Sequence, residues 1–206
     1  MALRIVLAIL AGYIFGNLNG AIITSNFVLH GDVREHGSGN AGLTNFLRSY
    51  GGASTFLVLA IDIGKTVLAC LVGMCLFSEY GLEAEGKMLC GMACVVGHMF
   101  PVVYGFKGGK GILSAGTLAV VMDWRMGLVV LGIFAVVVVC TRYVSLGSII
   151  AAAAYPLAGL AFFWGDWAVV LMMLAVGILA VYMHRANIER LVHHTESKFS
   201  IHKNKS

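Results

Sequence analysis

A stretch that runs from Gly37 to Arg48, with the sequence GSGNAGLTNFLR, combines residue types that are suited to binding an anion. Its glycines let backbone N–H groups approach a bound group closely, and Arg48 carries a planar guanidinium that matches the geometry of a phosphate. Because the surrounding sequence is mostly apolar, we predict that this stretch binds a phosphorylated substrate. The residues that we assign to this binding are Ser38, Gly39, Asn40, Thr44, Asn45 and Arg48.

A second unusual loop spans residues 105–111, with the sequence GFKGGKG, and precedes an apolar segment. Glycine-rich backbone before the N-terminus of a helix is a typical phosphate site, and Lys107 and Lys110 add positive charge. The pattern GxxxxGK[ST] of nucleotide-binding loops is absent from it. The same composition is also typical of a flexible basic turn at a membrane surface. If the loop binds substrate, the residues that do so are Gly108, Gly109, Lys110 and Gly111.

The third cluster, residues 184–191 with the sequence HRANIERL, follows the last apolar segment. If this cluster continues the preceding helix, His184, Asn187 and Leu191 share one face. The imidazole of His184 has the chemistry to donate to a phosphate or to act as a general base. A basic segment in contact with lipid headgroups is the alternative interpretation.

The rest of the chain predicts an all-α integral membrane protein, a helix bundle that forms one domain over residues 1–206. Hydrophobic residues make up 59% of the chain and charged residues 12%, with a mean hydropathy of +0.89, and this balance is typical of membrane proteins with several spans. A spanning helix needs about 20 residues. We predict seven apolar segments, at residues 3–26, 52–78, 87–105, 111–122, 126–141, 145–164 and 167–183. The fourth and fifth are short, so one helix over 111–141 is the alternative.

The charges of the loops decide the predicted orientation. With seven spans, ten cations lie on one side of the membrane, and only Arg4, Lys87 and Arg125 lie on the other. The ten are Arg34, Arg48, Lys107, Lys110, Arg142, Arg185, Arg190, Lys198, Lys203 and Lys205. Because positive charge concentrates in cytoplasmic loops, the N-terminus is expected outside and the C-terminus inside. All three polar clusters then emerge at the cytoplasmic face and are expected to form one anion site there.

Several polar residues within the apolar segments each allow two interpretations. Asp62 and Lys65 lie one helical turn apart, either as functional intramembrane charges or as a mutually neutralised structural pair. The small and polar residues 16–20 are expected either to pack helices closely or to line the site. His98 is expected either to bond within the bundle or to line the site, and Arg142 is either a phosphate contact or only a topology signal.

These segments closely resemble the motifs of the bacterial acyl-phosphate:glycerol-3-phosphate acyltransferase family, the PlsY type. The matching residues are Gly37-Ser38-Gly39-Asn40-x-Gly42-x-Thr44-Asn45-x-x-Arg48, the whole of 105–111, and His184-Arg185-x-Asn187-Ile188-x-Arg190-Leu191. Gly97-His98-x-x-Pro101, Asp62-x-x-Lys65 and residues 141–146 fit the same pattern, so the resemblance covers nearly the whole chain. In two departures, Ala41 stands where the family usually has proline, and His194 stands where it usually has glycine.

The resemblance implies a seven-span, multi-pass protein of the bacterial inner membrane with its active site at the cytoplasmic face. Its implied activity is transfer of a fatty acyl group from acyl phosphate to the 1-hydroxyl of glycerol 3-phosphate, which yields lysophosphatidic acid and phosphate early in phospholipid biosynthesis. The expected partners are these two substrates and the lipid bilayer, with the acyl-phosphate-synthesising enzyme as a further candidate. We predict no cofactor, no metal and no nucleic acid.

Under this interpretation, the catalytic residues are Lys107, His184 and Asn187. Ser38, Arg48, Lys107, His184 and Asn187 are expected to hold glycerol 3-phosphate. The backbone of 108–111 and Lys110 are expected to hold the acyl-phosphate group, while the acyl chain lies between helices that open to lipid. The base is either His184 or a phosphate oxygen of the substrate.

Two other functions compete with this interpretation. A transporter of a phosphorylated metabolite usually has its polar site near the middle of the membrane, between internal repeats. We find no convincing repeat, and only Asp62 and Lys65 favour that function. A membrane-anchored phosphate-binding regulator is the weaker alternative, because the sequence predicts no second soluble domain.

Overall fold

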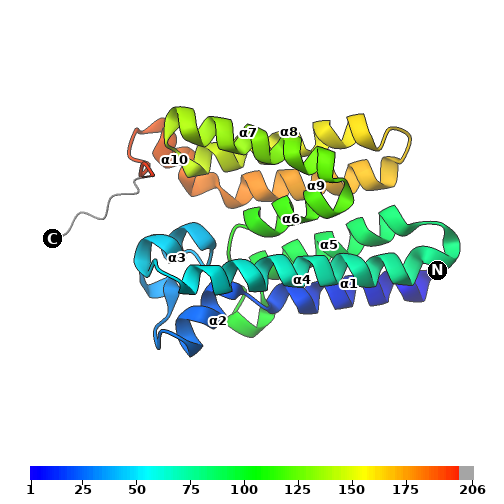
Figure 1. The fold of residues 1–206 in the computed structure, drawn as a ribbon, viewed down its shortest axis with the longest axis horizontal. Helices are drawn as coiled ribbons and strands as arrows, with labels where there is room; N and C mark the ends of the chain where they lie inside the picture. Colours follow the sequence, from blue (N-terminus) through cyan, green and yellow to red (C-terminus); the bar gives the residue numbers. More distant parts are fainter. Residues whose placement is uncertain (200–206) are drawn as a thin grey trace.

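The computed structural model of the protein describes residues 1–199, which form a bundle of helices (Figure 1). The α-helices are α1 (Ala2–Asn17), α2 (Gly20–Phe27), α3 (Leu43–Ser49), α4 (Ser54–Phe77), α5 (Glu83–Met99), α6 (Ile112–Met122), α7 (Trp124–Thr141), α8 (Val144–Phe162), α9 (Trp167–Met183) and α10 (Arg185–Val192). Short 3-10 turns η1 (Val33–Glu35), η2 (Ser78–Tyr80) and η3 (Val102–Tyr104) lie between them. Lys203 and Lys205, two of the ten cations counted above, lie outside the described residues.

The helices are long and apolar enough for a multi-pass membrane protein. Five stretches of the described chain have the length and composition of a membrane span. They are Ala2–Phe27, Ser54–Tyr80, Glu83–Tyr104, Trp124–Thr141 and Val144–Phe162. A sixth arises if α9 and α10, which meet at a bend of 54°, are one broken span. The predicted fourth segment, 111–122, is the short apolar helix α6.

The first apolar segment, expected over 3–26, corresponds to one candidate span from Ala2 to Phe27, but the helix is interrupted within it. Helix α1 ends at Asn17, and α2 begins at Gly20, because the side chain of Asn19 accepts the N–H of Ile22 at 3.0 Å and caps the second helix. A capping side chain satisfies one of the N–H groups that a helix start leaves without a partner.

The fourth and fifth segments are separate helices, so the alternative of one helix over 111–141 is wrong. The carboxylate of Asp123 accepts the N–H of Arg125 at 2.8 Å and caps the start of α7. The chain turns back there, and α7 packs closely against α6. A Cβ at Gly127 would lie 2.6 Å from the Cα of Val120, so the missing side chain permits this approach.

Close packing also joins α1 to α5. A Cβ at Gly12 would lie 2.2 Å from the carbonyl oxygen of Cys90, and one at Gly16 would lie 2.3 Å from that of Cys94. The packing interpretation of residues 16–20 therefore holds for Gly16. Figure 1 shows α1, α4 and α5 on one side of the bundle, α7, α8 and α9 on the other, and α6 between them. Helices α2, α3 and α10 gather at the end that lies opposite the N-terminus.

Candidate functional site

A cavity of about 930 Å³ brings the three predicted clusters together. The first cluster contributes Gly37, Ser38, Asn40, Gly42, Leu43, Thr44, Asn45 and Arg48 to its lining, the second contributes Lys110 and Gly111, and the third contributes His184, Asn187 and Arg190. Helices α6, α7, α8 and α9 supply apolar walls. Segments separated by more than 60 residues thus meet at one site.

Five of the predicted site residues do not line this cavity. They are Gly39, Lys107, Gly108, Gly109 and Arg142. Lys107 is exposed and lines a separate hollow with Gly39 and with the ion pair of Asp32 and Arg34. Arg142 is exposed where α7 ends, in the left-handed conformation.

Gly108 and Gly109 pack against α5 behind the cavity. The N–H of Gly109 donates to the carbonyl oxygen of His98 at 3.1 Å. A Cβ at Gly108 would lie 2.0 Å from that same oxygen, and one at Gly109 would lie 2.3 Å from Nε2 of His98. These glycines therefore let the second loop lie directly on the end of α5, which brings Lys110 and Gly111 to the cavity.

The first loop is shaped by Asn45 from within. The side-chain amide of Asn45 is buried and donates to the carbonyl oxygens of Val33 and His36 at 3.0 and 2.9 Å, while its oxygen accepts the N–H of Ser38 at 2.8 Å. Gly37 has φ +59°, which glycine adopts readily. Asn45 therefore orders the loop, and the more exposed Ser38 is presented at the cavity rim.

A hydrogen-bond network connects the second and third clusters to α8. Nζ of Lys110 donates to Oδ1 of Asn187, and the amide nitrogen of Asn187 donates to Oε1 of Glu196 at 2.9 Å. Ser145 donates to the same oxygen at 2.8 Å, and Arg190 donates to Oε2 at 2.7 Å. Sequence reasoning did not select Glu196 or Ser145 as site residues. The signal available for Glu196 was its position as a carboxylate in a basic tail.

The charges of the network change the pKa values of its members. Burial, together with the positive charges of Arg190 and Arg48, lowers the pKa of Lys110 to about 8, although Glu196 opposes this shift. Burial by itself would raise the pKa of Glu196, but the hydrogen bonds from Arg190, Asn187 and Ser145 outweigh it and lower that pKa. The cavity end is therefore cationic near neutral pH, with Glu196 ionised beneath it.

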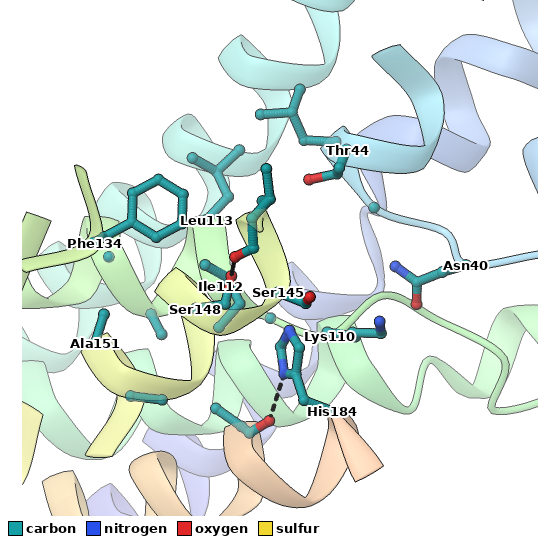
Figure 2. Close-up of a pocket in the computed structure, with 18 of the residues that line it drawn as sticks. Asn40, Thr44, Lys110, Ile112, Leu113, Phe134, Ser145, Ser148, Ala151 and His184 are labelled. Carbon is teal, nitrogen blue, oxygen red and sulfur yellow. Dashed lines mark hydrogen bonds between the residues drawn. The ribbon is translucent and has the colours of Figure 1, made fainter. Parts of the chain in front are cut away.

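His184 lies at the bend between α9 and α10, so the third cluster is not a straight continuation of the preceding helix. Its Nδ1 lies 2.8 Å from the carbonyl oxygen of Ala180, and a carbonyl oxygen only accepts, so Nδ1 carries the proton. The lone pair is then on Nε2. Figure 2 shows this other ring nitrogen directed into the cavity, near Ser145 and Lys110. His184 at this 54° bend and Asn187 on α10 both line the cavity.

Asp62 and Lys65 on α4 form a buried cluster with His98 on α5. Nζ of Lys65 lies 2.8 Å from Oδ1 of Asp62 and 2.8 Å from Nδ1 of His98. It also donates to the carbonyl oxygens of Gly16 and Leu18, at 3.3 and 2.8 Å. Asp62 accepts the N–H of Gly20 at 3.1 Å.

This cluster satisfies the break between α1 and α2. A break leaves carbonyl groups at the end of one helix and N–H groups at the start of the next without partners, and a membrane interior offers no water to replace them. Lys65 bonds to the carbonyls and Asp62 to the N–H. These bonds support the structural interpretation of this pair, and Asp62 also lines the cavity. His98 both bonds within the bundle and lines the cavity.

Comparison with known proteins gives consistent matches over nearly the whole chain. A family model described as glycerol-3-phosphate acyltransferase matches residues 6–194. A glycerol-3-phosphate acyltransferase of Finegoldia magna is 41% identical over 189 residues, which cover 90% of this chain and 91% of the relative. One of a Thermoanaerobacter species is 39% identical over 193 residues and 94% of both chains.

Solved structures agree with these sequence matches. The crystal structure of PlsY, an integral membrane glycerol 3-phosphate acyltransferase, in its glycerol 3-phosphate form is similar with a TM-score of 0.82 and 31% identity, covering 95% of this chain and 96% of that one. Its lysophosphatidic acid form gives a TM-score of 0.82 at 30% identity, with 95% of both chains covered.

Proposed function

Because the chain belongs to the glycerol-3-phosphate acyltransferase family, we propose that it transfers a fatty acyl group from acyl phosphate to the 1-hydroxyl of glycerol 3-phosphate. The family model and the curated relatives confirm the family that the sequence motifs resemble. The observation that carries the proposal is a single cavity with a cationic end and an apolar arm. The cationic end is lined by Arg48, Lys110 and Arg190, and the apolar arm is lined by residues that include Phe134 and Val176. An acyl phosphate and the lysophosphatidic acid product each carry an anionic phosphate group and an apolar acyl chain, which match these two parts of the cavity.

We assign glycerol 3-phosphate to Ser38, Arg48, His184 and Asn187 at the cationic end. The acyl-phosphate group is assigned to Lys110 and the adjacent backbone of Gly111. Lys107 and Arg142 receive no contact with substrate in this proposal, since neither lines the cavity.

Catalysis by this site would depend mainly on positioning and charge neutralisation. An acyl phosphate is a mixed anhydride, so its phosphate is already a good leaving group, and well-placed reactants can gain about 7–11 kcal/mol of the barrier from orientation alone. The 1-hydroxyl attacks the acyl carbon and loses its proton to Nε2 of His184. The bond from the acyl carbon to the phosphate oxygen breaks, and Lys110 neutralises the phosphate that leaves. The alternative base is a phosphate oxygen of the substrate.

We also propose seven membrane passes, with the N-terminus outside, the C-terminus in the cytoplasm and the site at the cytoplasmic face of the inner membrane. The excess of positive charge near the site supports this orientation. Helix α6, fourth in chain order and enclosed by α4 and α7, would be the short pass that brings the number to seven. Single cysteines in a cysteine-free background test it. Ser38→Cys and Lys107→Cys should react with a membrane-impermeant reagent only after the cytoplasmic side is opened, and Gly81→Cys should react in intact cells.

The proposed activity is tested by mixing the purified protein with palmitoyl phosphate and glycerol 3-phosphate and measuring phosphate release. Release should require both substrates and should match the lysophosphatidic acid formed, mole for mole. Release that does not depend on glycerol 3-phosphate, or acylation that proceeds only from acyl-CoA, would refute the assignment. The enzyme that supplies acyl phosphate remains a predicted partner, because a reactive anhydride is best delivered over a short distance.

Transport of a phosphorylated metabolite gains no support from the polar groups within the membrane. Only Asp62 and Lys65 had favoured it, and both are bonded to the ends of the broken first helix.

A further inference from the structure

The apolar arm of the cavity runs from the cationic end into the bundle. Figure 2 shows Asn40, Lys110 and His184 on one side of Ser145, and Phe134 and Ala151 on the other. The small side chains of α8 and the residues of α6 and α7 leave this space open. The arm is therefore where an acyl chain would lie if its phosphate were bound at the cationic end.

The length of the arm can be measured along α8. Ser145 is bonded to Glu196 at the cationic end, and Tyr155 lines the cavity ten residues further along the helix. At 1.5 Å per residue these residues lie about 15 Å apart along the axis. The hydrocarbon core of a bilayer is about 30 Å thick, so the acyl chains of one leaflet occupy about the same 15 Å. The arm thus matches one acyl chain of an ordinary membrane lipid.

Tyr155 is the lining residue of α8 that lies farthest from the cationic end. Its side chain is only 3% exposed, and its hydroxyl lies 3.7 Å from the sulfur of Met88 on α5. The buried ring is thus tied to α5 through its hydroxyl. A chain longer than the arm would meet this ring.

Gly116 on α6 leaves the middle of the arm open. It lines the cavity, and a Cβ there would meet only a methyl of Leu131, at 3.4 Å. By contrast, a Cβ at Gly127 would lie 2.6 Å from the Cα of Val120, and one at Gly177 would lie 2.7 Å from the carbonyl oxygen of Ala152, so close helix packing requires those glycines. Helix packing does not require Gly116. Its position, five residues beyond Gly111, is about 7.5 Å along α6 and so near half the depth of the arm.

We infer that the apolar arm selects the length of the acyl chain, with Gly116 keeping its deeper half open and Tyr155 setting its end. This inference rests on the proposed acyl transfer. It predicts that filling the space above Gly116 moves the preference of the enzyme toward shorter acyl chains without a comparable effect on glycerol 3-phosphate.

The experiment compares initial rates with saturated acyl phosphates from hexanoyl to eicosanoyl for the wild-type protein, Gly116→Leu and Gly132→Leu. Gly132 is the matched control, because it is exposed on α7 and nothing lies within 4 Å of a Cβ built there. In Gly116→Leu the ratio of kcat/KM for palmitoyl to hexanoyl phosphate should fall on the order of tenfold, the effect of about two buried methylene groups. Gly132→Leu should keep the wild-type ratio. The KM for glycerol 3-phosphate should change little in either variant.

A ratio in Gly116→Leu equal to that of wild type, whatever the absolute rate, would overturn the inference. If that variant does not fold, Gly116→Ala decides, because a Cβ at 3.4 Å is an ordinary contact; the ratio should then fall roughly fourfold, and an unchanged ratio would again overturn the inference. Failure of the proposed function has a different signature, which is a wild-type protein that acylates glycerol 3-phosphate from no acyl phosphate of any length.

Discussion

Replacing Lys65 with methionine should destabilise the protein strongly, although methionine fills a similar volume in an apolar interior. Asp62, which is 1% exposed, would lose its counter-ion, and its buried carboxyl group must then stay ionised without a partner or take up a proton, either of which costs free energy. The carbonyl groups of Gly16 and Leu18 would lose their donor at the end of α1. Removing one partner of a buried ion pair typically costs about 3–5 kcal/mol of the free energy of unfolding, which is roughly two to four orders of magnitude in the folding equilibrium.

A double-mutant cycle isolates the part of this loss that comes from the unpaired carboxylate. The purified protein would be unfolded in mixed micelles with increasing SDS, and helix content followed by circular dichroism. The double variant Asp62→Asn/Lys65→Met should be more stable than the sum of the two single losses predicts, by about 1–3 kcal/mol. Lys87→Met at the outer end of α5 is the control and should change stability by about 0.5 kcal/mol or less.

The reasoning fails if the two single losses add without coupling, or if Lys65→Met costs no more than Lys87→Met. Either result would mean that the charges of Asp62 and Lys65 do not depend on each other and that the break between α1 and α2 is stabilised in some other way.

Three further predictions concern the cavity itself. Arg48→Ala should raise the KM for glycerol 3-phosphate on the order of tenfold to a hundredfold, because it removes a hydrogen bond to a charged group. Arg142→Ala, which lies outside the cavity lining, should leave that KM within about twofold. Equal effects of the two variants would contradict the assignment of glycerol 3-phosphate to Arg48. His184→Gln should lower kcat by about 10²–10⁴ if Nε2 is the general base, and near-normal turnover at saturating substrate would leave the phosphate oxygen as the base. Burial and the charges of Arg190 and Arg48 lower the pKa of Lys110 to about 8, so the ammonium loses its proton as the pH rises through that value, and kcat/KM for acyl phosphate should fall above it. Lys110→Arg should abolish this decline. A wild-type pH profile of kcat/KM that stays flat up to the ordinary pKa range of lysine would refute the assignment of the acyl-phosphate group to Lys110.

The sequence predicted most helices well because hydropathy is a local property. The expected segments 126–141 and 167–183 agree with α7 and α9 to within two residues. The segment 3–26 agrees with the span Ala2–Phe27, but its internal break was not predicted. A polar insert in an apolar segment is tolerated in a membrane only where other elements satisfy its backbone groups. The side chains that satisfy these backbone groups belong to α4, more than 40 residues away along the chain, and no local sequence pattern indicates that they do so.

The candidate site shows the same division. Lys107 and Lys110 lie three residues apart in one loop and looked equally suited to a phosphate, yet only Lys110 lines the cavity. The difference arises because Gly108 and Gly109 pack against His98, so that the chain turns toward the cavity after Lys107. Glu196 was not predicted as a site residue, because its role depends on the side chains of Asn187 and Arg190 that donate to it in the folded protein.

By itself, the sequence determined the class of protein, the polar clusters and the chemistry that they offer, because residue type and spacing along the chain carry that information directly. Only the tertiary structure decided which of those groups face one cavity, where the first helix breaks and where the apolar arm ends at Tyr155. These features depend on contacts between helices that are distant in sequence, and such contacts follow from packing and from the need to satisfy every buried polar group.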